Sequence, residues 1–352
     1  PLPQTVKMEQ GTFEFSKKLK TAVDAYPGDS IQWVFDNFEK NFTATTGVKF
    51  QTGKMGKAAL QLKLNSSLAA EAYNLKVDEK QITIEAARPA GFFYALQTLQ
   101  QLLPTRAVLA GKAVGEDVKL TLPAVSVSDA PKFGWRGFML DEGRHFYGKE
   151  EIKKVLDVMA AYKMNRFHWH LTDDQGWRVE IKKYPKLTTI GATAPNSFFT
   201  DMESCTQYWI NKPYGPYFYT QEEIKDVVAY AKERHIEIIP EIDMPGHFVA
   251  AMAAYPEYSC TPNNPPTIWT TGGISSNVLN VANPQAVQFA KDILSELIEL
   301  FPYETIHIGG DECPTTQWEN NELCKARYKE LKLTNYRQLQ SHFIKEMADF
   351  VQ

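Results

Sequence analysis

The sequence Arg166-Phe-His-Trp-His-Leu171 reads as a strand, and it leads directly into the polar segment Thr172-Asp-Asp-Gln-Gly-Trp177. Three further strands, each followed by an acidic cluster, are predicted over 133–140, 236–242 and 305–308. Hydrophobic periodicity predicts an amphipathic helix after each strand, over 149–163, 221–234, from Pro284 onward and over 335–351. Four strand–helix units in succession predict a parallel sheet covered by helices.

Local signals mark where some of these elements begin. Thr220 with Glu223 forms a capping box before the second helix, and Asn283-Pro284 supplies an N-cap and a first helical residue for the third. Pro240 stands in the centre of the third strand, where a missing N–H disfavours pairing on both sides.

The N-terminal third has a different pattern. Residues 72–77 and 81–85 alternate in polarity around a turn and predict a hairpin, and the apolar spacing over 90–103 predicts an amphipathic helix beside it. Prolines at 104, 123 and 131 interrupt the next stretch of sequence, so the segment 121–132 is the expected boundary. We therefore predict a small α+β domain over 1–130 and a second domain over 131–352.

Composition excludes several classes of protein. The chain has 352 residues, of which 43% are hydrophobic and 23% charged, and this balance is that of a globular protein and not of a disordered one. The sequence has no apolar run long enough for a membrane span. Lys and Arg number 38 against 42 Asp and Glu, with no basic stripe, so no nucleic-acid partner is expected. Four cysteines are too few for a disulfide scaffold, and a Cys260–Cys313 bridge and two buried free thiols both remain open.

Polar residues gather where each predicted strand ends, and the C-terminal ends of parallel strands carry the active site in α/β folds. The sharpest cluster is Gly309-Gly-Asp-Glu312. Its two glycines allow a tight turn and a close ligand, and they present the adjacent carboxylates of Asp311 and Glu312. Taken alone, such a segment is also compatible with an ordinary loop that ends in a solvated acidic cap.

Several motifs resemble glycoside hydrolase family 20, the β-N-acetylhexosaminidases. They are Arg136-Gly-Phe-Met-Leu-Asp141 with Arg144-His-Phe146, His168-Trp-His-Leu-Thr-Asp-Asp-Gln-Gly-Trp-Arg178, Asp243-Met-Pro-Gly-His247 and His307-Ile-Gly-Gly-Asp-Glu312. The motifs occur in the family's order and extend the resemblance from residue 133 to the end. The N-terminal hairpin and helix look like the family's non-catalytic domain.

The resemblance implies a retaining, substrate-assisted mechanism, which is an exception to the scheme of two protein carboxylates. Glu312 is then the general acid and base. The 2-acetamido oxygen of the substrate is the nucleophile and forms an oxazolinium ion, and Asp311 orients the acetamido N–H and stabilises the positive charge.

Four further residues are expected at the substrate site. Arg144 matches the family position that grips hydroxyls of the terminal sugar, although a surface ion pair with Asp141 is the plainer alternative. Asp173 and His247 match the residues that link to the acid/base in a carboxylate–imidazole–carboxylate chain. Trp177 either lines the sugar site or packs inside a loop.

Three more carboxylates, Asp174, Glu241 and Asp243, are expected to support the fold and not to contact substrate. His168 and His170 share one face of a strand, which with an Asp also suggests a zinc hydrolase. Their place within the strand, and on the second unit instead of the first, speaks against a metal, so no metal and no cofactor are expected.

The resemblance also implies a barrel. A complete (β/α)₈ barrel needs ~250 residues, and residues 133–352 contain only four strand–helix units. The predicted fold class is therefore α/β, a small α+β N-terminal domain followed by a TIM (β/α)₈-type barrel of which only the first four βα units are present. The family's later tryptophans and tyrosine have no counterpart here. We expect the N-terminal portion of a longer enzyme, inactive or nearly so by itself.

The predicted function is a retaining exo-β-N-acetylhexosaminidase that acts on glycans with a terminal N-acetylhexosamine. The alternatives are a catalytically silent glycan-binding protein and a metal-dependent barrel hydrolase. The family and its substrate imply a secreted, periplasmic or outer-surface location, and the oligomeric state is not legible in the sequence.

Overall fold

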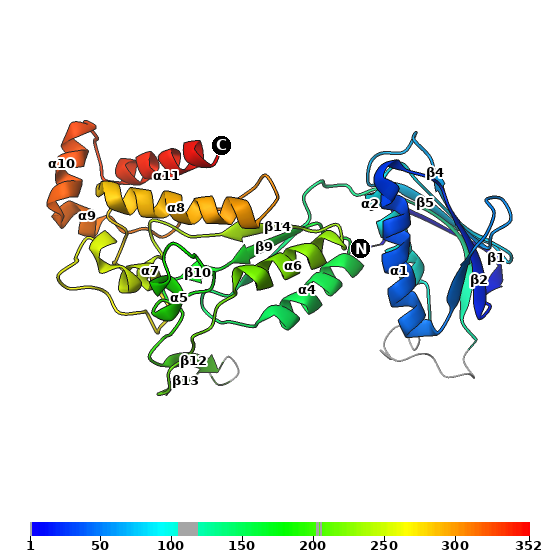
Figure 1. Ribbon diagram of the computed structural model, residues 1–352, viewed down its shortest axis with the longest axis horizontal. Coiled ribbons are helices and arrows are strands. Elements are labelled where there is room, and N and C mark those ends of the chain that lie inside the picture. Colours follow the sequence, from blue (N-terminus) through cyan, green and yellow to red (C-terminus); the bar gives the residue numbers. More distant parts are fainter. Residues whose placement is uncertain (1, 105–118, 202–203, 205) are drawn as a thin grey trace. The chain divides into compact units, whose positions relative to one another are not determined.

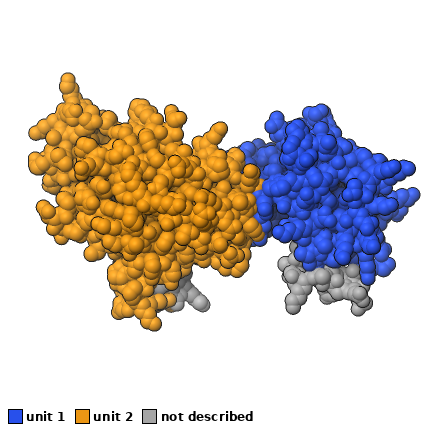
Figure 2. Space-filling view, viewed as in Figure 1, with its two compact units in different colours: residues 1–136, 157–165, 233–235 blue, residues 137–156, 166–232, 236–352 orange. Residues whose placement is uncertain are grey.

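A computed structural model describes residues 2–104, 119–201, 204 and 206–352. The chain divides into two compact units, which Figure 2 shows in different colours. Unit 1 comprises 1–136, 157–165 and 233–235, and unit 2 comprises 137–156, 166–232 and 236–352. Among the described residues, no helix is both long and apolar enough to cross a membrane.

Unit 1 is built on a seven-stranded sheet with the order β1-β7-β5-β6-β4-β2-β3. The strands are β1 (Thr5–Glu14), β2 (Lys18–Val23), β3 (Lys49–Thr52), β4 (Leu60–Leu64), β5 (Tyr73–Val77), β6 (Ile82–Ala86) and β7 (Thr121–Asp129). Helices α1 (Ser30–Thr46) and α2 (Pro89–Gln101) pack against this sheet (Figure 1). The predicted hairpin is the antiparallel pair β5–β6, and the predicted helix is α2.

The expected boundary over 121–132 is wrong in one respect, because most of it is strand β7. This strand pairs with β1 on one side and with β5 on the other, so it lies inside the sheet. In the sequence, Pro123 had suggested a domain boundary instead of a strand. It precedes the stretch from Val125 to Asp129 that pairs with β5, so its missing N–H removes no hydrogen bond from that ladder.

Unit 2 contains a parallel sheet with the order β14-β9-β8. Its strands are β8 (Gly137–Asp141), β9 (Arg166–His170) and β14 (Glu237–Glu241). Strand β8 is shorter than the predicted 133–140, and Phe133 and Trp135 before it stay largely exposed. The pairing partner sets this start, because β9 begins at Arg166 and Arg166 lies opposite Gly137.

The predicted fourth strand over 305–308 is wrong, because it is reduced to an isolated bridge between Glu241 and His307. His307 donates its N–H to the Pro240 carbonyl at 3.0 Å and accepts from Ile242 N at 3.1 Å. In a strand, the N–H and the carbonyl of one residue point toward the same neighbouring strand. Because the Pro240 carbonyl points toward His307, the missing N–H of Pro240 lies on the His307 side as well. The described sheet accordingly has three strands. Pro240 is buried within β14, so the objection to its position is wrong, and its missing N–H only weakens pairing on the side of His307.

The four predicted helices of this part are present as α4 (Lys149–Ala161), α6 (Gln221–Lys232), α8 (Pro284–Leu300) and α11 (Arg337–Val351). The capping box forms, with Thr220 N donating to Glu223 Oε2 at 3.0 Å and Glu223 N donating to Thr220 Oγ1 at 3.2 Å. Asn283 Oδ1 accepts from Gln285 N, so the predicted N-cap of α8 is also confirmed. Helices α8 and α11 pack side by side (Figure 1).

The remaining short elements lie in loops that the sequence patterns did not resolve. They are η1 (Pro27–Asp29), β10 (Thr172–Asp173), β11 (Gly176–Trp177), α5 (Lys186–Thr189), β12 (Ser197–Asp201), β13 (Thr206–Ile210), α7 (Val249–Ala254), η2 (Pro256–Tyr258), α9 (Thr316–Asn320) and α10 (Glu322–Glu330). Strands β12 and β13 form a hairpin.

Candidate active site

The turn after the fourth strand position presents Asp311 and Glu312. Gly309 has φ 63°, and a Cβ built on it would lie 1.8 Å from Asp243 Oδ1, so only glycine fits there. Asp243 Oδ1 accepts a hydrogen bond from Gly310 N at 2.9 Å and thereby holds the turn. Glu312 also adopts a left-handed conformation, with φ 43°, which is unfavourable for a residue with a side chain. Both carboxylates are exposed at the end of this constrained turn.

Asp243 is the support expected from the sequence, and its environment is unusual. Burial raises its pKa to about 7, and the nearby charge of Asp311 adds to the effect. The carboxyl is therefore partly protonated at neutral pH.

His247 connects Glu312 to the buried carboxylates behind it. Its Nε2 lies 3.3 Å from Glu312 Oε2, and its Nδ1 lies 3.1 Å from Asp173 Oδ1 and 3.4 Å from Asp174 Oδ2. The imidazole is buried, whereas the Glu312 side chain is 53% exposed. Hydrogen bonds to Asp173 and then to Asp174 raise the pKa of His247 to about 11. The ring is therefore a cation, and its Nε2 lies in ion-pair distance of Glu312 without forming a hydrogen bond.

Asp173 is the centre of the cluster. Its Oδ2 forms an ion pair with Arg144 Nη1 at 2.8 Å and accepts from His170 Nε2 at 2.7 Å, while Oδ1 faces His247. Burial alone would raise the pKa of Asp173, but the hydrogen bonds from His170 and His247 and the charge of Arg144 hold it below its usual value. The structure thus joins Arg144, Asp173, His247 and Glu312 in one continuous chain of ion pairs, which we call the acid/base chain after the role that the sequence analysis expects of Glu312.

Arg144 makes the ion pair with Asp141 that the sequence suggested, and a second one with Asp173 that it did not. Its Nη1 pairs with Asp141 Oδ2 at 2.9 Å as well as with Asp173, and its side chain remains partly exposed. The ion pair with Asp141 is therefore confirmed and helps to fix Arg144, and the contact of Arg144 with sugar hydroxyls stays a prediction.

Two buried residues that the sequence analysis did not single out hold this loop. Glu142 accepts from Trp169 Nε1 at 2.6 Å and from Tyr219 Oη at 2.7 Å. Arg178 donates Nε to the Glu142 carbonyl and Nη2 to the Gly143 carbonyl. The sequence offered little indication of these roles. A charged residue beside a motif is normally exposed, and only the fold shows that Glu142 and Arg178 are buried.

Trp177 does not line the site in this structure. The ring is buried, packs edge-on against Phe248 with centroids 5.7 Å apart, and donates Nε1 to the Val179 carbonyl at 2.6 Å. The suggestion that it forms a sugar platform is therefore corrected, and the packed loop tryptophan is what the structure has.

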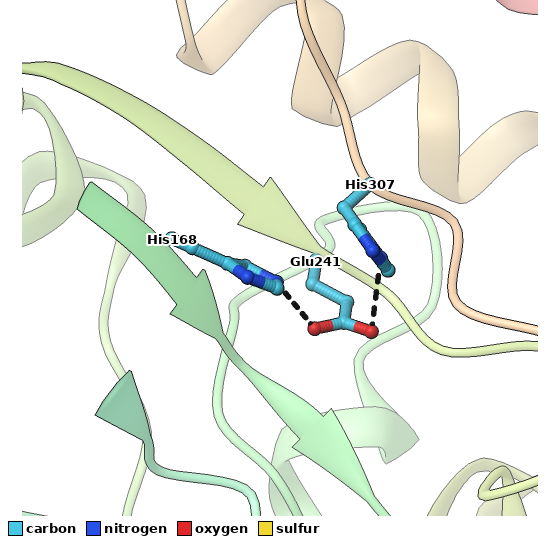
Figure 3. A group of neighbouring side chains, drawn as sticks. All are labelled: His168, Glu241 and His307. Carbon is cyan, nitrogen blue, oxygen red and sulfur yellow. Dashed lines mark hydrogen bonds and ion pairs between the residues drawn. The ribbon is translucent and has the colours of Figure 1, made fainter. Parts of the chain in front are cut away.

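His168 and His170, which the sequence suggested as possible zinc ligands, both contact Glu241, and so does His307. His168 Nε2 lies 2.6 Å from Glu241 Oε2, and His307 Nδ1 lies 3.0 Å from Oε1 (Figure 3). His170 Nδ1 lies 2.7 Å from the same Oε2. Burial alone would raise the pKa of Glu241, but hydrogen bonds from the three imidazoles lower it.

His170 cannot serve as a metal ligand in this state. Both its ring nitrogens donate to carboxylates, those of Glu241 and Asp173, and these bonds raise its pKa to about 10 against the opposing effect of burial. A doubly protonated imidazole has no lone pair for a metal ion. His168, Glu241 and His307 still offer atoms within 4.8 Å of one another, but His168 Nε2 is committed to the carboxylate.

Of the two possibilities for the cysteines, a disulfide or free thiols, the structure has free thiols. Cys260, Cys313 and Cys324 are buried and free, so the Cys260–Cys313 bridge is not present in this structure. Cys205 lies outside the described residues.

The chain thus has an α/β fold in which a cluster of carboxylates and imidazoles lies at the C-terminal end of a parallel sheet. The profile of "Glycosyl hydrolase family 20, catalytic domain" matches residues 133–352, and that of "Glycosyl hydrolase family 20, domain 2" matches 1–130. The chain therefore belongs to glycosyl hydrolase family 20.

Individual relatives agree with this assignment. A β-hexosaminidase of Porphyromonas gingivalis is 38% identical over 357 residues, covering 100% of this chain and 43% of the relative. One of Vibrio furnissii is 40% identical over 297 residues, covering 84% of this chain and 46% of the relative. The crystal structure of a family 20 exo-β-N-acetylglucosaminidase from Vibrio harveyi, in complex with N-acetylglucosamine, superposes with a TM-score of 0.84 at 34% identity. It is matched over 100% of this chain and 52% of its own. The chain thus spans about half the length of these relatives.

Proposed function

We propose that this chain carries the acid/base half of a retaining β-N-acetylhexosaminidase, which removes terminal N-acetylglucosamine or N-acetylgalactosamine from glycans. The observation that carries the proposal is the acid/base chain, in which the buried side chains of His247 and Asp173 link a half-exposed Glu312 to a partly exposed Arg144. The names of the relatives, β-hexosaminidases and an exo-β-N-acetylglucosaminidase, support the same activity.

In the proposed first step, Glu312 transfers its proton to the glycosidic oxygen as the bond from that oxygen to C1 breaks. The acetamido oxygen of the substrate forms the new bond to C1 and gives an oxazolinium ion. Asp311 accepts a hydrogen bond from the acetamido N–H and stabilises the positive charge. In the second step water attacks C1 as the bond from C1 to the acetamido oxygen breaks, Glu312 takes a proton from the water, and the product keeps the original configuration.

His247 and Asp173 prepare Glu312 for this exchange. The His247 cation lies against Glu312 on one side and the Asp173 carboxylate on the other, so it stabilises the anionic form that Glu312 adopts after giving up its proton. The free donors of Arg144 suit the hydroxyls of the terminal sugar, because its guanidinium is fixed by two carboxylates.

The proposal extends to the surroundings of the site. We place residues 131–352 in a (β/α)₈ barrel whose remaining strands supply the other walls of the sugar site. A glycan substrate also suits a secreted, periplasmic or outer-surface location.

The deciding experiment compares an aryl N-acetyl-β-glucosaminide with the matching β-glucoside in the complete enzyme. Only the first substrate carries the nucleophile, so we expect it to be hydrolysed and the glucoside to remain intact. Comparable cleavage of both would refute substrate assistance. Tight binding of N-acetylglucosamine without turnover would favour the catalytically silent glycan-binding alternative.

A further inference from the structure

The contacts of the acid/base chain continue beyond Asp173 to the end of the parallel sheet. His170, the last residue of β9, is 4% exposed. Its Nε2 donates to Asp173 Oδ2 at 2.7 Å, and its Nδ1 donates to Glu241 Oε2 at 2.7 Å. The proposed mechanism gives no part to His170 or Glu241, although both belong to the same line of buried contacts.

Backbone pairing holds His170 in one position. In the register of the sheet it lies between Asp141 of β8 and Glu241 of β14. Its carbonyl accepts hydrogen bonds from Glu142 N at 3.0 Å and from Gly143 N at 3.2 Å. The imidazole therefore projects from a fixed strand end, which also holds the loop after β8.

The groups around the His170 ring favour its charged form. Those that face it from the segments packed against it are Asp141 at the end of β8, Arg144 in the loop after β8, Asp173 in β10, Glu241 at the end of β14 and His307 in the segment after α8. Burial alone would lower the pKa of His170, but the hydrogen bonds to Asp173 and Glu241 raise it to about 10. The ring is therefore an imidazolium at neutral pH.

Charge alternates along this line of contacts. Five groups follow one another at distances of 2.7, 2.7, 3.1 and 3.3 Å: Glu241, His170, Asp173, His247 and Glu312. The first and third are carboxylates, and the second and fourth are cations. Removing an inner member leaves its neighbours without a counter-charge in a buried place, so the members depend on one another.

Glu241 anchors the far end of this line. Two further imidazoles contact it, with His168 Nε2 2.6 Å from Oε2 and His307 Nδ1 3.0 Å from Oε1 (Figure 3). Among the described residues, His170 is the side chain that bonds to both Glu241 and Asp173. His170 is thus the link between the anchored carboxylate and the acid/base chain.

We infer that His170 is a positioning residue for the acid of the proposed function, and that it fixes Asp173 so that His247 stays beside Glu312. This inference rests on the proposed function and deepens it. His170 occupies Oδ2 of Asp173 and leaves Oδ1 to His247, whose Nδ1 lies 3.1 Å away. Without the imidazolium, the carboxylate loses both this orientation and a positive charge behind it. The proton transfers at C1 remain those of Glu312.

The test compares three variants of the complete enzyme, with an aryl N-acetyl-β-glucosaminide as substrate. The amide of His170→Gln can still donate near the position of Nε2, toward Asp173, whereas the amide of His170→Asn can donate only near the position of Nδ1, toward Glu241. Both variants remove the charge. The matched control is His168→Gln, two residues earlier on the same face of β9, because His168 also bonds to Glu241 but is not a member of the line.

We expect His170→Asn to lower kcat by at least about tenfold and up to about 10²-fold, the cost of misplacing a catalytic group, with KM nearly unchanged. His170→Gln should recover part of this loss, because its amide still holds Asp173. Both should move the alkaline limb of the kcat/KM profile, which reports the protonated acid, to higher pH by about half a unit or more. The reason is that a nearby positive charge no longer favours the anion of the acid. His168→Gln should leave kcat and this limb almost unchanged.

Two results would overturn the inference alone: a kcat of His170→Asn close to that of wild type, or an alkaline limb of His170→Gln at the wild-type position. A loss of kcat in His168→Gln as large as in His170→Asn would also overturn it, because the effect would then come from Glu241 or from packing. Urea unfolding checks that each variant is folded, and if His170→Asn is not, the alkaline limb of His170→Gln decides. A wild-type enzyme that does not cleave the substrate would overturn the proposed function and the inference together.

Discussion

Replacing Asp173 with asparagine removes a negative charge that lies between three cationic side chains. The carboxylate is fully buried and faces Arg144 at 2.8 Å, His170 at 2.7 Å and His247 at 3.1 Å. Asparagine has nearly the same volume, so packing is preserved while the charge is lost. The three cations then repel one another in a buried site without their common counterion.

The expected loss of stability is large for a single conservative substitution. Removing one partner of a buried ion pair costs about 3–5 kcal/mol, and we expect Asp173→Asn to lower the free energy of unfolding by that amount at pH 7. The matched control is Asp226→Asn, which breaks contacts of 2.9 Å and 3.1 Å to Lys153 and Lys149 at the surface. Exposed pairs contribute about 0–1 kcal/mol, so this control should change little.

The pH dependence of this loss in unfolding free energy shows whether it comes from the missing charge or from altered packing. The pKa of Asp173 is lower in the folded state than in the unfolded chain, so its contribution is present above the unfolded value of about 3.9 and is lost as the pH falls through the folded value. Urea unfolding followed by tryptophan fluorescence, between pH 7 and pH 3, should show the difference from wild type shrinking below about pH 4. A loss at pH 7 no larger than that of Asp226→Asn would refute the reasoning, and so would a loss independent of pH.

Three further outcomes are expected. Glu312→Gln should lower kcat for an aryl N-acetyl-β-glucosaminide in the complete enzyme by about 10²–10⁴-fold, the usual contribution of a general acid, and near-normal turnover would exclude Glu312 as the acid. Gly309→Ala should lower the free energy of unfolding by at least about 1–3 kcal/mol, because its Cβ would overlap Asp243 Oδ1 in a left-handed conformation. Gly272→Ala, with nothing within 4 Å of its Cβ, is the control, and equal losses in urea unfolding would contradict this reasoning. Asp243→Asn should stabilise the protein at pH 8 by no more than about 4 kcal/mol and hardly change it at pH 4. The reason is that a pKa raised to about 7 makes ionisation costly in the folded state, and a variant less stable than wild type at pH 8 would show that the charge is needed.

Local sequence signals predicted the elements that depend on near neighbours. The capping box of Thr220 and Glu223 and the N-cap Asn283 are formed as expected, because each is completed within three residues. The polarity patterns predicted strand boundaries wrongly where pairing with a strand distant in the sequence sets those boundaries. The apolar segment 305–308 makes only one bridge, and strand β8 starts at Gly137 because β9 starts at its partner Arg166.

The site was predictable in its residue types and less so in its connections. The motifs placed Arg144, Asp173, His247 and Glu312 at the ends of different strands, and the structure joins them. The motifs did not reveal that the Trp177 side chain is buried. The sequence of a motif is the same whether its tryptophan packs in the core or lines a binding site.

The sequence by itself determined that carboxylates follow each predicted strand of a parallel α/β unit and that histidines lie in or near these strands. Only the tertiary structure decided which of them meet. The register of the parallel sheet sets Asp141 opposite His170 and His170 opposite Glu241, so residues separated by about a hundred positions form one row at the end of the sheet. Hydrogen bonding between strands fixes that row, and this pairing cannot be read from either strand alone.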